Sequence, residues 1–160
     1  MTEAELPIRI PCDLDLPGAW AALRQHCTQG APVRLTGIDR LPPVAAAQLL
    51  DFFLHDGTVT SRVEPFASLL AAMIHRQELG LWELLGAAGD DHLQGLPRNH
   101  PECLACPAFA VCQGYGTWAG SCETWRGLIT GLAAAARELA HLRDLNRSNA
   151  RGSHGHPQPN

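Results

Sequence analysis

Four cysteines between positions 103 and 122 are the residues of this chain best suited to chemistry. They are spaced as C-x2-C-x5-C-x9-C, at Cys103, Cys106, Cys112 and Cys122. Thiolates are soft ligands that suit zinc ions and iron–sulfur clusters, and a C-x2-C pair places two sulfurs on one turn. The spacing therefore predicts that all four cysteines bind one metal centre.

The same spacing separates the possible centres. Structural zinc sites typically combine two C-x2-C pairs, whereas this stretch has one such pair, and Cys112 and Cys122 stand singly. The pattern favours one 4Fe-4S cluster, with one Zn2+ ion as the alternative. A redox disulfide between Cys103 and Cys106 is a third hypothesis. The sequence around these two cysteines does not resemble that of a thioredoxin, so it gives this hypothesis no support.

The residues around the cysteines agree with a thiolate site. Gly114, Gly116 and Gly120 can bring backbone N–H groups close to sulfur, as cluster hydrogen bonding requires. Ser121 is expected to cap the following helix, which places Cys122 in the first turn. The helix dipole there favours a deprotonated thiol.

Other residues with chemical potential have simpler interpretations. His92 and His100 flank the cysteines, but four thiolates already complete a ligand set, so both histidines are expected on the surface. Trp118 and Trp125 are expected to pack in the core, and the charged Arg126 is expected on an exposed helix face. The remaining thiols, Cys12 and Cys27, have no neighbouring cysteine and are expected to be buried or neutral at the surface.

The elements that must position this site follow from periodicity and turn residues. Short apolar runs predict strands at 6–10, 32–36 and 58–63. Apolar residues at helical spacing predict helices at 19–29, 44–55, 65–79, 81–87 and 121–147. The alternation implies right-handed crossovers, so we expect a helix-rich α/β fold with a small, mainly parallel sheet covered by helices.

Composition shifts divide the chain into four segments. We expect an α/β domain over 1–90, a linker over 91–102, a four-cysteine module with a long C-terminal helix over 103–147, and a disordered tail over 148–160.

Residues 6–88 resemble a STAS-type domain. The resemblance is carried by the Cys12-Asp-Leu-Asp-Leu segment and by the apolar patterns at 19–23, 30–35, 44–50, 69–73 and 79–85. It implies a protein–protein interaction module. Some STAS domains are switched by phosphorylation where the second major helix begins, but this chain has Leu41-Pro-Pro-Val44 there and no hydroxyl group.

Residues 103–142 resemble the SPASM domain of radical SAM peptide maturases, in which a C-x2-C-x5-C-x3-C run and a later cysteine serve two auxiliary 4Fe–4S clusters. The resemblance implies that the four cysteines match the ligands of the second auxiliary cluster: Cys103, Cys106, Cys112 and Cys122. Gly116 stands where a ligand of the other cluster would be, which implies that this other cluster is absent.

The catalytic half of a radical SAM enzyme has no counterpart. The C-x3-C-x2-C run that binds the S-adenosylmethionine-cleaving cluster does not occur in the sequence. We therefore expect no radical chemistry from this chain alone.

Composition limits the partners and the compartment. The net charge is −4, so no basic surface for nucleic acid is expected. No apolar run is long enough to cross a membrane, and the N-terminal residues lack the pattern of a signal peptide. A cytoplasmic protein is expected. In this reducing compartment, clustered cysteines are more often metal ligands than disulfides.

Together these observations predict a non-catalytic iron–sulfur accessory protein. It would dock to a partner enzyme or precursor peptide, or relay electrons, for example for a radical SAM maturase in modified-peptide biosynthesis. The alternatives are a zinc-stapled interaction module without a redox role and an enzyme that uses the cluster directly. For the last, no general acid or base stands out beside the cysteines.

Overall fold

Three parallel strands form the sheet of the N-terminal half in the computed structural model, which describes residues 6–86 and 98–152. The strands β1 (Ile8–Pro11), β2 (Val33–Thr36) and β3 (Val63–Glu64) lie in the order β1-β2-β3. Ile8 pairs with Val33, and Val33 pairs with Val63. The expected small, parallel sheet is confirmed among these described strands.

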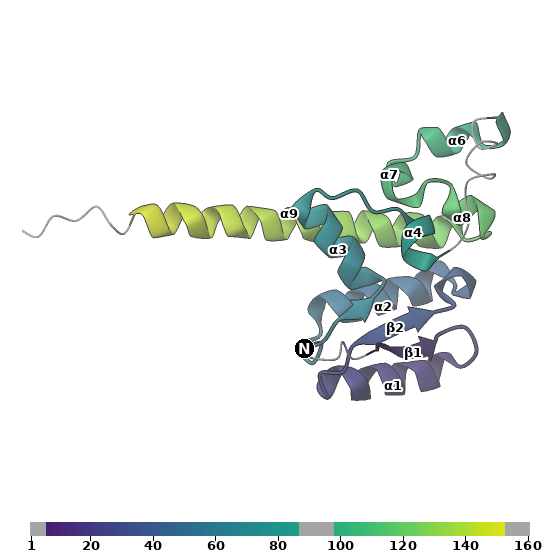
Figure 1. Ribbon diagram of the computed structural model, residues 1–160, viewed down its shortest axis with the longest axis horizontal. Coiled ribbons are helices and arrows are strands. Elements are labelled where there is room, and N and C mark those ends of the chain that lie inside the picture. The colour runs from purple at the N-terminus through teal and green to yellow at the C-terminus, as the bar shows by residue number, and fades with distance from the viewer. Residues whose placement is uncertain (1–5, 87–97, 153–160) are drawn as a thin grey trace, which may run out of the picture.

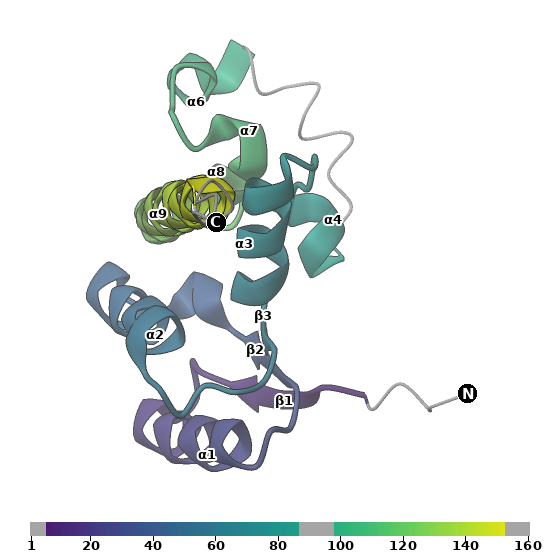
Figure 2. The same ribbon diagram turned by 90° about the vertical axis from the view of Figure 1, so that its left-hand side faces the viewer.

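The two crossover helices lie on one face of the sheet, as consecutive right-handed connections require (Figure 2). They are α1 (Leu16–Thr28) and α2 (Pro43–His55). Side chains alternate along a strand, so the strand residues of this face are buried: Ile10, Val33, Leu35 and Val63. Asp15 accepts a hydrogen bond from the N–H of Gly18 and caps the start of α1.

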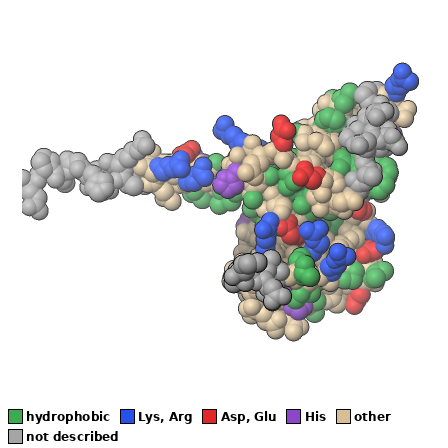
Figure 3. All heavy atoms as spheres, viewed as in Figure 1, with side chains coloured by type: hydrophobic (Ala, Val, Ile, Leu, Met, Phe, Trp, Pro, Cys, Tyr) green, Lys and Arg blue, Asp and Glu red, His purple; other side chains and the backbone are tan. Residues whose placement is uncertain are grey.

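The opposite face of the sheet carries charged residues. Arg9, Arg34 and Glu64 lie side by side across the three strands. Figure 3 shows charged side chains gathered on this part of the surface. Pro11 lies on the edge strand β1, where its missing N–H makes pairing with another strand less favourable.

The long helix α9 (Cys122–Gly152) joins the two halves of the chain. It packs across α2 and α3 (Phe66–His75), and its first half carries the buried Trp125, Leu128 and Leu132. These side chains belong to the same hydrophobic core as Val33 and Leu35 of the sheet. The two predicted domains therefore share one core, and α9 lies alongside α3 above the sheet (Figure 1).

Asp39 fixes the position of α9 against the sheet. It lies in the 3-10 helix η1 (Ile38–Arg40) that follows β2. Its carboxylate accepts hydrogen bonds from Tyr115 Oη at 2.9 Å, Ser121 Oγ at 3.3 Å and Trp125 Nε1 at 2.6 Å. A buried fourth contact joins the same regions, since Thr124 Oγ1 donates to the carbonyl of Leu41.

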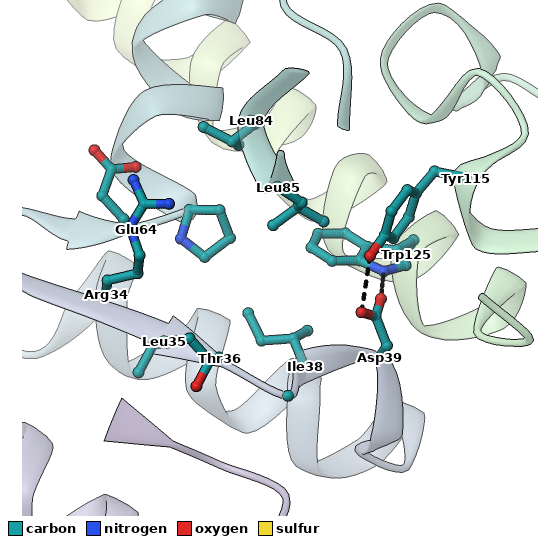
Figure 4. A pocket seen from close by; sticks show the side chains of 12 residues that line it. Arg34, Leu35, Thr36, Ile38, Asp39, Glu64, Leu84, Leu85, Tyr115 and Trp125 are labelled. Carbon is teal, nitrogen blue, oxygen red and sulfur yellow. Dashed lines mark hydrogen bonds between the residues drawn. The ribbon is translucent and has the colours of Figure 1, made fainter. Parts of the chain in front are cut away.

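A cavity of about 190 Å3 lies beside this hydrogen-bonded group, at the carboxyl end of β2. Figure 4 shows Tyr115 and Trp125 reaching Asp39 from the C-terminal half, with Arg34 and Glu64 at the far side of the cavity. Burial raises the pKa of the Tyr115 phenol, and the neighbouring carboxylate of Asp39 raises it further. Tyr115 therefore stays a neutral donor at physiological pH.

Several predicted boundaries are wrong for local reasons. The strand expected over 58–63 is reduced to β3, because Thr58 donates its N–H and its hydroxyl to Asp56 and forms a turn instead. The helix expected over 65–79 ends at His75, where Arg76 adopts a left-handed conformation with φ of 54°. The next helix, α4 (Leu81–Leu85), is shorter than the expected 81–87, of which residue 87 lies outside the described residues.

Two expectations about the C-terminal half also change. Helix α9 continues to Gly152, so residues 148–152 extend the helix and are not part of a disordered tail. In the segment expected to be a linker, 101–102 belong to α6 (Pro101–Leu104), whereas 91–97 lie outside the described residues, as do 153–160 of the expected tail. Among the helices that the structure describes, none is long and apolar enough to cross a membrane.

Replacing Asp39 by alanine should destabilise the protein strongly. Three donors would lose their acceptor, and each buried unsatisfied group costs about 1–3 kcal/mol, so we expect the free energy of unfolding in urea to fall by about 3 kcal/mol or more. Asp39→Asn, which keeps one carbonyl oxygen, should lose less. The control Asp51→Ala removes an exposed carboxylate of α2 and should change stability by about 0.5 kcal/mol at most. Equal losses for Asp39→Ala and Asp51→Ala would contradict the role given to Asp39.

Candidate metal centre

The four cysteines lie in a region of three short helices and at the start of α9. The helices are α6 (Pro101–Leu104), α7 (Phe109–Cys112) and α8 (Tyr115–Trp118), each of four residues. Pro101 begins α6, and Gln113 and Gly114 end α7 in the left-handed conformation, with φ of 48° and 79°. These breaks turn the chain sharply between successive cysteines.

Cys103 and Cys106 lie on one tight turn. The N–H of Cys106 donates to the carbonyl of Cys103 at 3.0 Å, and the N–H of Phe109 donates to the carbonyl of Cys106 at 2.9 Å. The Sγ atom of Cys103 is buried and lies 3.0 Å from Thr117 Oγ1 of α8. The turn expected from the C-x2-C spacing is therefore present.

Cys112 lies at the end of α7 and is buried. The N–H of Gly116 donates to Cys112 Sγ at 3.3 Å. Burial raises the pKa of the Cys112 thiol, the N–H groups of Gly116 and Gly114 oppose this rise, and the nearby Cys122 and Cys103 add to it. Two of the three glycines expected to approach sulfur therefore do so.

Gly116 also determines how closely two parts of the site approach. A Cβ atom on Gly116 would lie 3.0 Å from the Cα of Cys122 and 3.5 Å from Cys112 Sγ. The first distance is tight for carbon atoms and involves backbone, which cannot move aside easily. A cysteine at this position, as the two-cluster SPASM pattern has, would require the loop to shift.

Cys122 is the first residue of α9 and is exposed. The residue before it is Ser121, whose hydroxyl donates to Asp39; its role as a helix cap stays a prediction. The N–H of Ser121 donates to the carbonyl of Gly116 at 2.8 Å, which closes the loop over α8. The anchoring of Asp39 therefore also positions the fourth cysteine.

All four cysteines line one cavity of about 540 Å3. Other chemically active side chains at its wall are Thr117, His100, Glu102 and Arg126. Arg126 is exposed on α9, as expected, and His100 is half-buried; both border this cavity. The imidazole Nδ1 of His100 lies 3.2 Å from Glu102 Oε1. His92 lies outside the described residues.

The arrangement can be compared with the two candidate centres. Zinc holds four sulfurs at about 2.3 Å, so they must nearly touch one another around the ion. Within residues 6–86 and 98–152, no three His, Cys, Asp or Glu side chains are grouped closely enough to hold a metal ion. The four thiols line a shared cavity, and the choice between one 4Fe-4S cluster and one Zn2+ ion stays a prediction.

The two remaining cysteines take no part in this cavity. Cys12 and Cys27 are both buried in the α/β half. Burial raises the pKa of Cys12 to about 11, and the carboxylate of Asp13 contributes to this rise. Burial also raises the pKa of Cys27. Both thiols are therefore protonated at neutral pH, as inert core residues.

An aromatic cluster packs against the loop that carries the cysteines. The rings of Trp82, Tyr115, Trp118 and Trp125 lie with neighbouring centroids 5.1–6.0 Å apart. Trp82 Nε1 donates to the carbonyl of Gln113, which fixes the left-handed turn after Cys112. Trp125 is fully buried as expected, whereas Trp118 is 53% exposed, so the expectation that it packs in the core is only partly met.

Comparisons with protein-family models, with curated proteins and with solved structures give no match to this chain. The resemblances to STAS and SPASM domains therefore stay predictions, and the assignment of the site depends on the residues themselves.

Replacing Gly116 by alanine should damage the cysteine site. The new Cβ would press on the Cα of Cys122, and overpacking of this kind typically lowers the free energy of unfolding by about 1–3 kcal/mol. Because the cysteines would be displaced, we also expect less bound metal per chain. The control Gly127→Ala lies in α9 with no atom within 4 Å of the added methyl group. It should instead stabilise the helix by about 0.5–1 kcal/mol. Thermal unfolding and metal analysis of both variants test this, and unchanged metal content in Gly116→Ala would contradict it.

Proposed function

We propose that this protein is a non-catalytic iron–sulfur accessory protein in which Cys103, Cys106, Cys112 and Cys122 hold one 4Fe-4S cluster. It docks to a partner enzyme or relays electrons to it. A radical SAM maturase that modifies peptides is the partner class that the SPASM resemblance implies. The observation that carries the proposal is the single cavity lined by all four cysteines.

The surroundings of the sulfurs support a cluster that transfers electrons. When bound, a 4Fe-4S cluster supplies one-electron redox chemistry, and its potential depends on net charge, hydrogen bonds to sulfur and exposure. The N–H of Gly116 reaches the sulfur of Cys112, and the positive charge of Arg126 lies at the same cavity. Both features stabilise negative charge on the sulfurs.

The four cysteines are buried to different extents, so one side of the site is more accessible to a partner than the other. Cys103 and Cys112 are buried, Cys106 is half-buried and Cys122 is exposed. An electron donor or acceptor could therefore approach most closely at Cys122 and the neighbouring Arg126. We place the docking face for a redox partner at this end of α9.

One other titratable group at the cavity, Glu102, is poorly suited to donate a proton. A hydrogen bond from its own backbone N–H lowers the pKa of Glu102, and a second from His100 lowers it further. Glu102 is therefore ionised at neutral pH and is a poor proton donor. The Nδ1 atom of His100 lies 3.2 Å from Glu102 Oε1.

Anaerobic purification or reconstitution should give about four iron and four sulfide per chain, with a broad visible absorption. Cys103→Ser and Cys122→Ser should each lose most of the iron, because each removes a ligand. Cys12→Ser and Cys27→Ser serve as controls, since these thiols lie outside the cavity, and should keep the iron wherever the variant folds. A colourless protein with one zinc and no iron would replace the proposal with a zinc-stapled interaction module.

Arg126→Gln should make the reduction potential of the reconstituted protein more negative. The reduced cluster carries one more negative charge, so loss of a nearby positive charge disfavours it, by roughly tens of millivolts for one screened charge. The control Arg137→Gln removes an exposed charge about 16 Å further along α9 and should have little effect. A redox titration followed by absorbance measures both. If the cluster could not be reduced reversibly, its role would be structural only.

A further inference from the structure

The C-terminal part of α9 extends away from the rest of the molecule (Figure 1). Burial along the helix ends at Ala136, and from there to Ser148 only Ala140 is even half-buried. We call residues 137–148 the arm. An isolated helix of this length is marginally stable in water, so a helix that continues beyond its core contacts calls for an explanation.

The arm carries an exposed apolar stripe. Leu139, Leu142 and Leu145 are 45%, 49% and 47% exposed. Leu139 and Leu142 continue, at the heptad spacing of a helix-pairing surface, the line that Leu128 and Leu132 begin inside the core. Leu139 and Leu142 therefore lie on the side of α9 that faces α2 and α3, just beyond the point where those helices stop covering it.

Charges of opposite sign border the stripe. At 100° per residue, Arg143 and Arg147 lie along one side of Leu139 and Leu142, and Glu138 lies along the other. Arg143 forms no ion pair among the described residues, and Arg147 contacts only Asp144, at 4.0 Å. One border is thus basic and available to acidic groups of a partner.

A second copy of the chain is a poor occupant of the stripe. In a parallel pair, both copies would bring their α2 and α3 into the space between the two helices, because these helices cover the same side of α9. In an antiparallel pair, like borders face each other, so Arg143 and Arg147 would oppose the same arginines of the other copy. Neither orientation satisfies both shape and charge.

We propose that the arm is a docking surface for an amphipathic helix of a different protein, with an apolar stripe and acidic residues that face Arg143 and Arg147. The stripe supplies affinity, and the basic border supplies orientation and selectivity. This surface lies at the opposite end of α9 from the cysteines. The inference therefore stands whether the centre holds iron–sulfur or zinc.

Two designed peptides test the proposal against the full-length protein. Each has about 21 residues, or three heptads, with leucine at positions a and d. One carries glutamate at e and g, and the other carries lysine there. Fluorescence anisotropy with labelled peptides should show that the wild-type protein prefers the glutamate peptide, by roughly two- to fivefold for each arginine that forms a pair.

Three variants identify the residues responsible. Leu139→Ala combined with Leu142→Ala should weaken binding of the glutamate peptide at least tenfold. It should keep its helical circular dichroism, because alanine favours helix. Arg143→Glu combined with Arg147→Glu should reverse the preference toward the lysine peptide. Arg137→Glu, on the far side of the arm, is the matched control and should leave the preference unchanged.

Two results would overturn the proposal. The first is that the wild-type protein binds neither peptide, or binds both in a way that the double charge reversal does not change. The second is that sedimentation shows a dimer that Leu139→Ala with Leu142→Ala dissociates. The stripe would then serve a second copy of this chain.

Discussion

The carboxylate of Asp39 is the interaction on which the rest of the structure most depends. One side chain from the end of a sheet strand accepts hydrogen bonds from Tyr115, Ser121 and Trp125. These three donors come from the loop that holds the cysteines and from the first turn of α9. A carboxylate has enough lone pairs to accept all three donors, whereas a neutral side chain of this size does not. The cysteine loop is thereby tied to the sheet, although more than 70 residues separate them in the chain.

Regular elements with strong local signals could be predicted from the sequence. The helix at 44–55 and the strand at 32–36 were placed within one residue, because buried apolar residues and prolines marked their limits. The prediction of a strand over 58–63 was wrong because a local hydrogen bond from Thr58 to Asp56 competes with pairing in the sheet. The predicted end of the last helix was wrong because the polar residues after Arg147 lower helix propensity but do not stop a helix that has already formed.

The grouping of the four cysteines could be predicted from the sequence, but the residues that hold their loop in place could not. Cysteine spacing alone grouped Cys103, Cys106, Cys112 and Cys122, which line one cavity. Asp39 carried no signal of its role, since a single aspartate after a strand is common and its partners lie far along the chain. Arg126 lies on an exposed helix face as predicted, but sequence periodicity could not show that this face and His100 border a cavity.

The length of α9 has a consequence for any assembly that this protein forms. From Cys122 to Leu142 the helix rises about 30 Å, which is close to the diameter of a small domain. A partner domain about 30 Å across that binds at Leu142 can thus just reach Cys122 with its opposite edge. A partner domain of smaller diameter cannot reach it. The rigid helix would act as a spacer that selects partners by width. It could equally keep two different molecules, one at each end, from colliding.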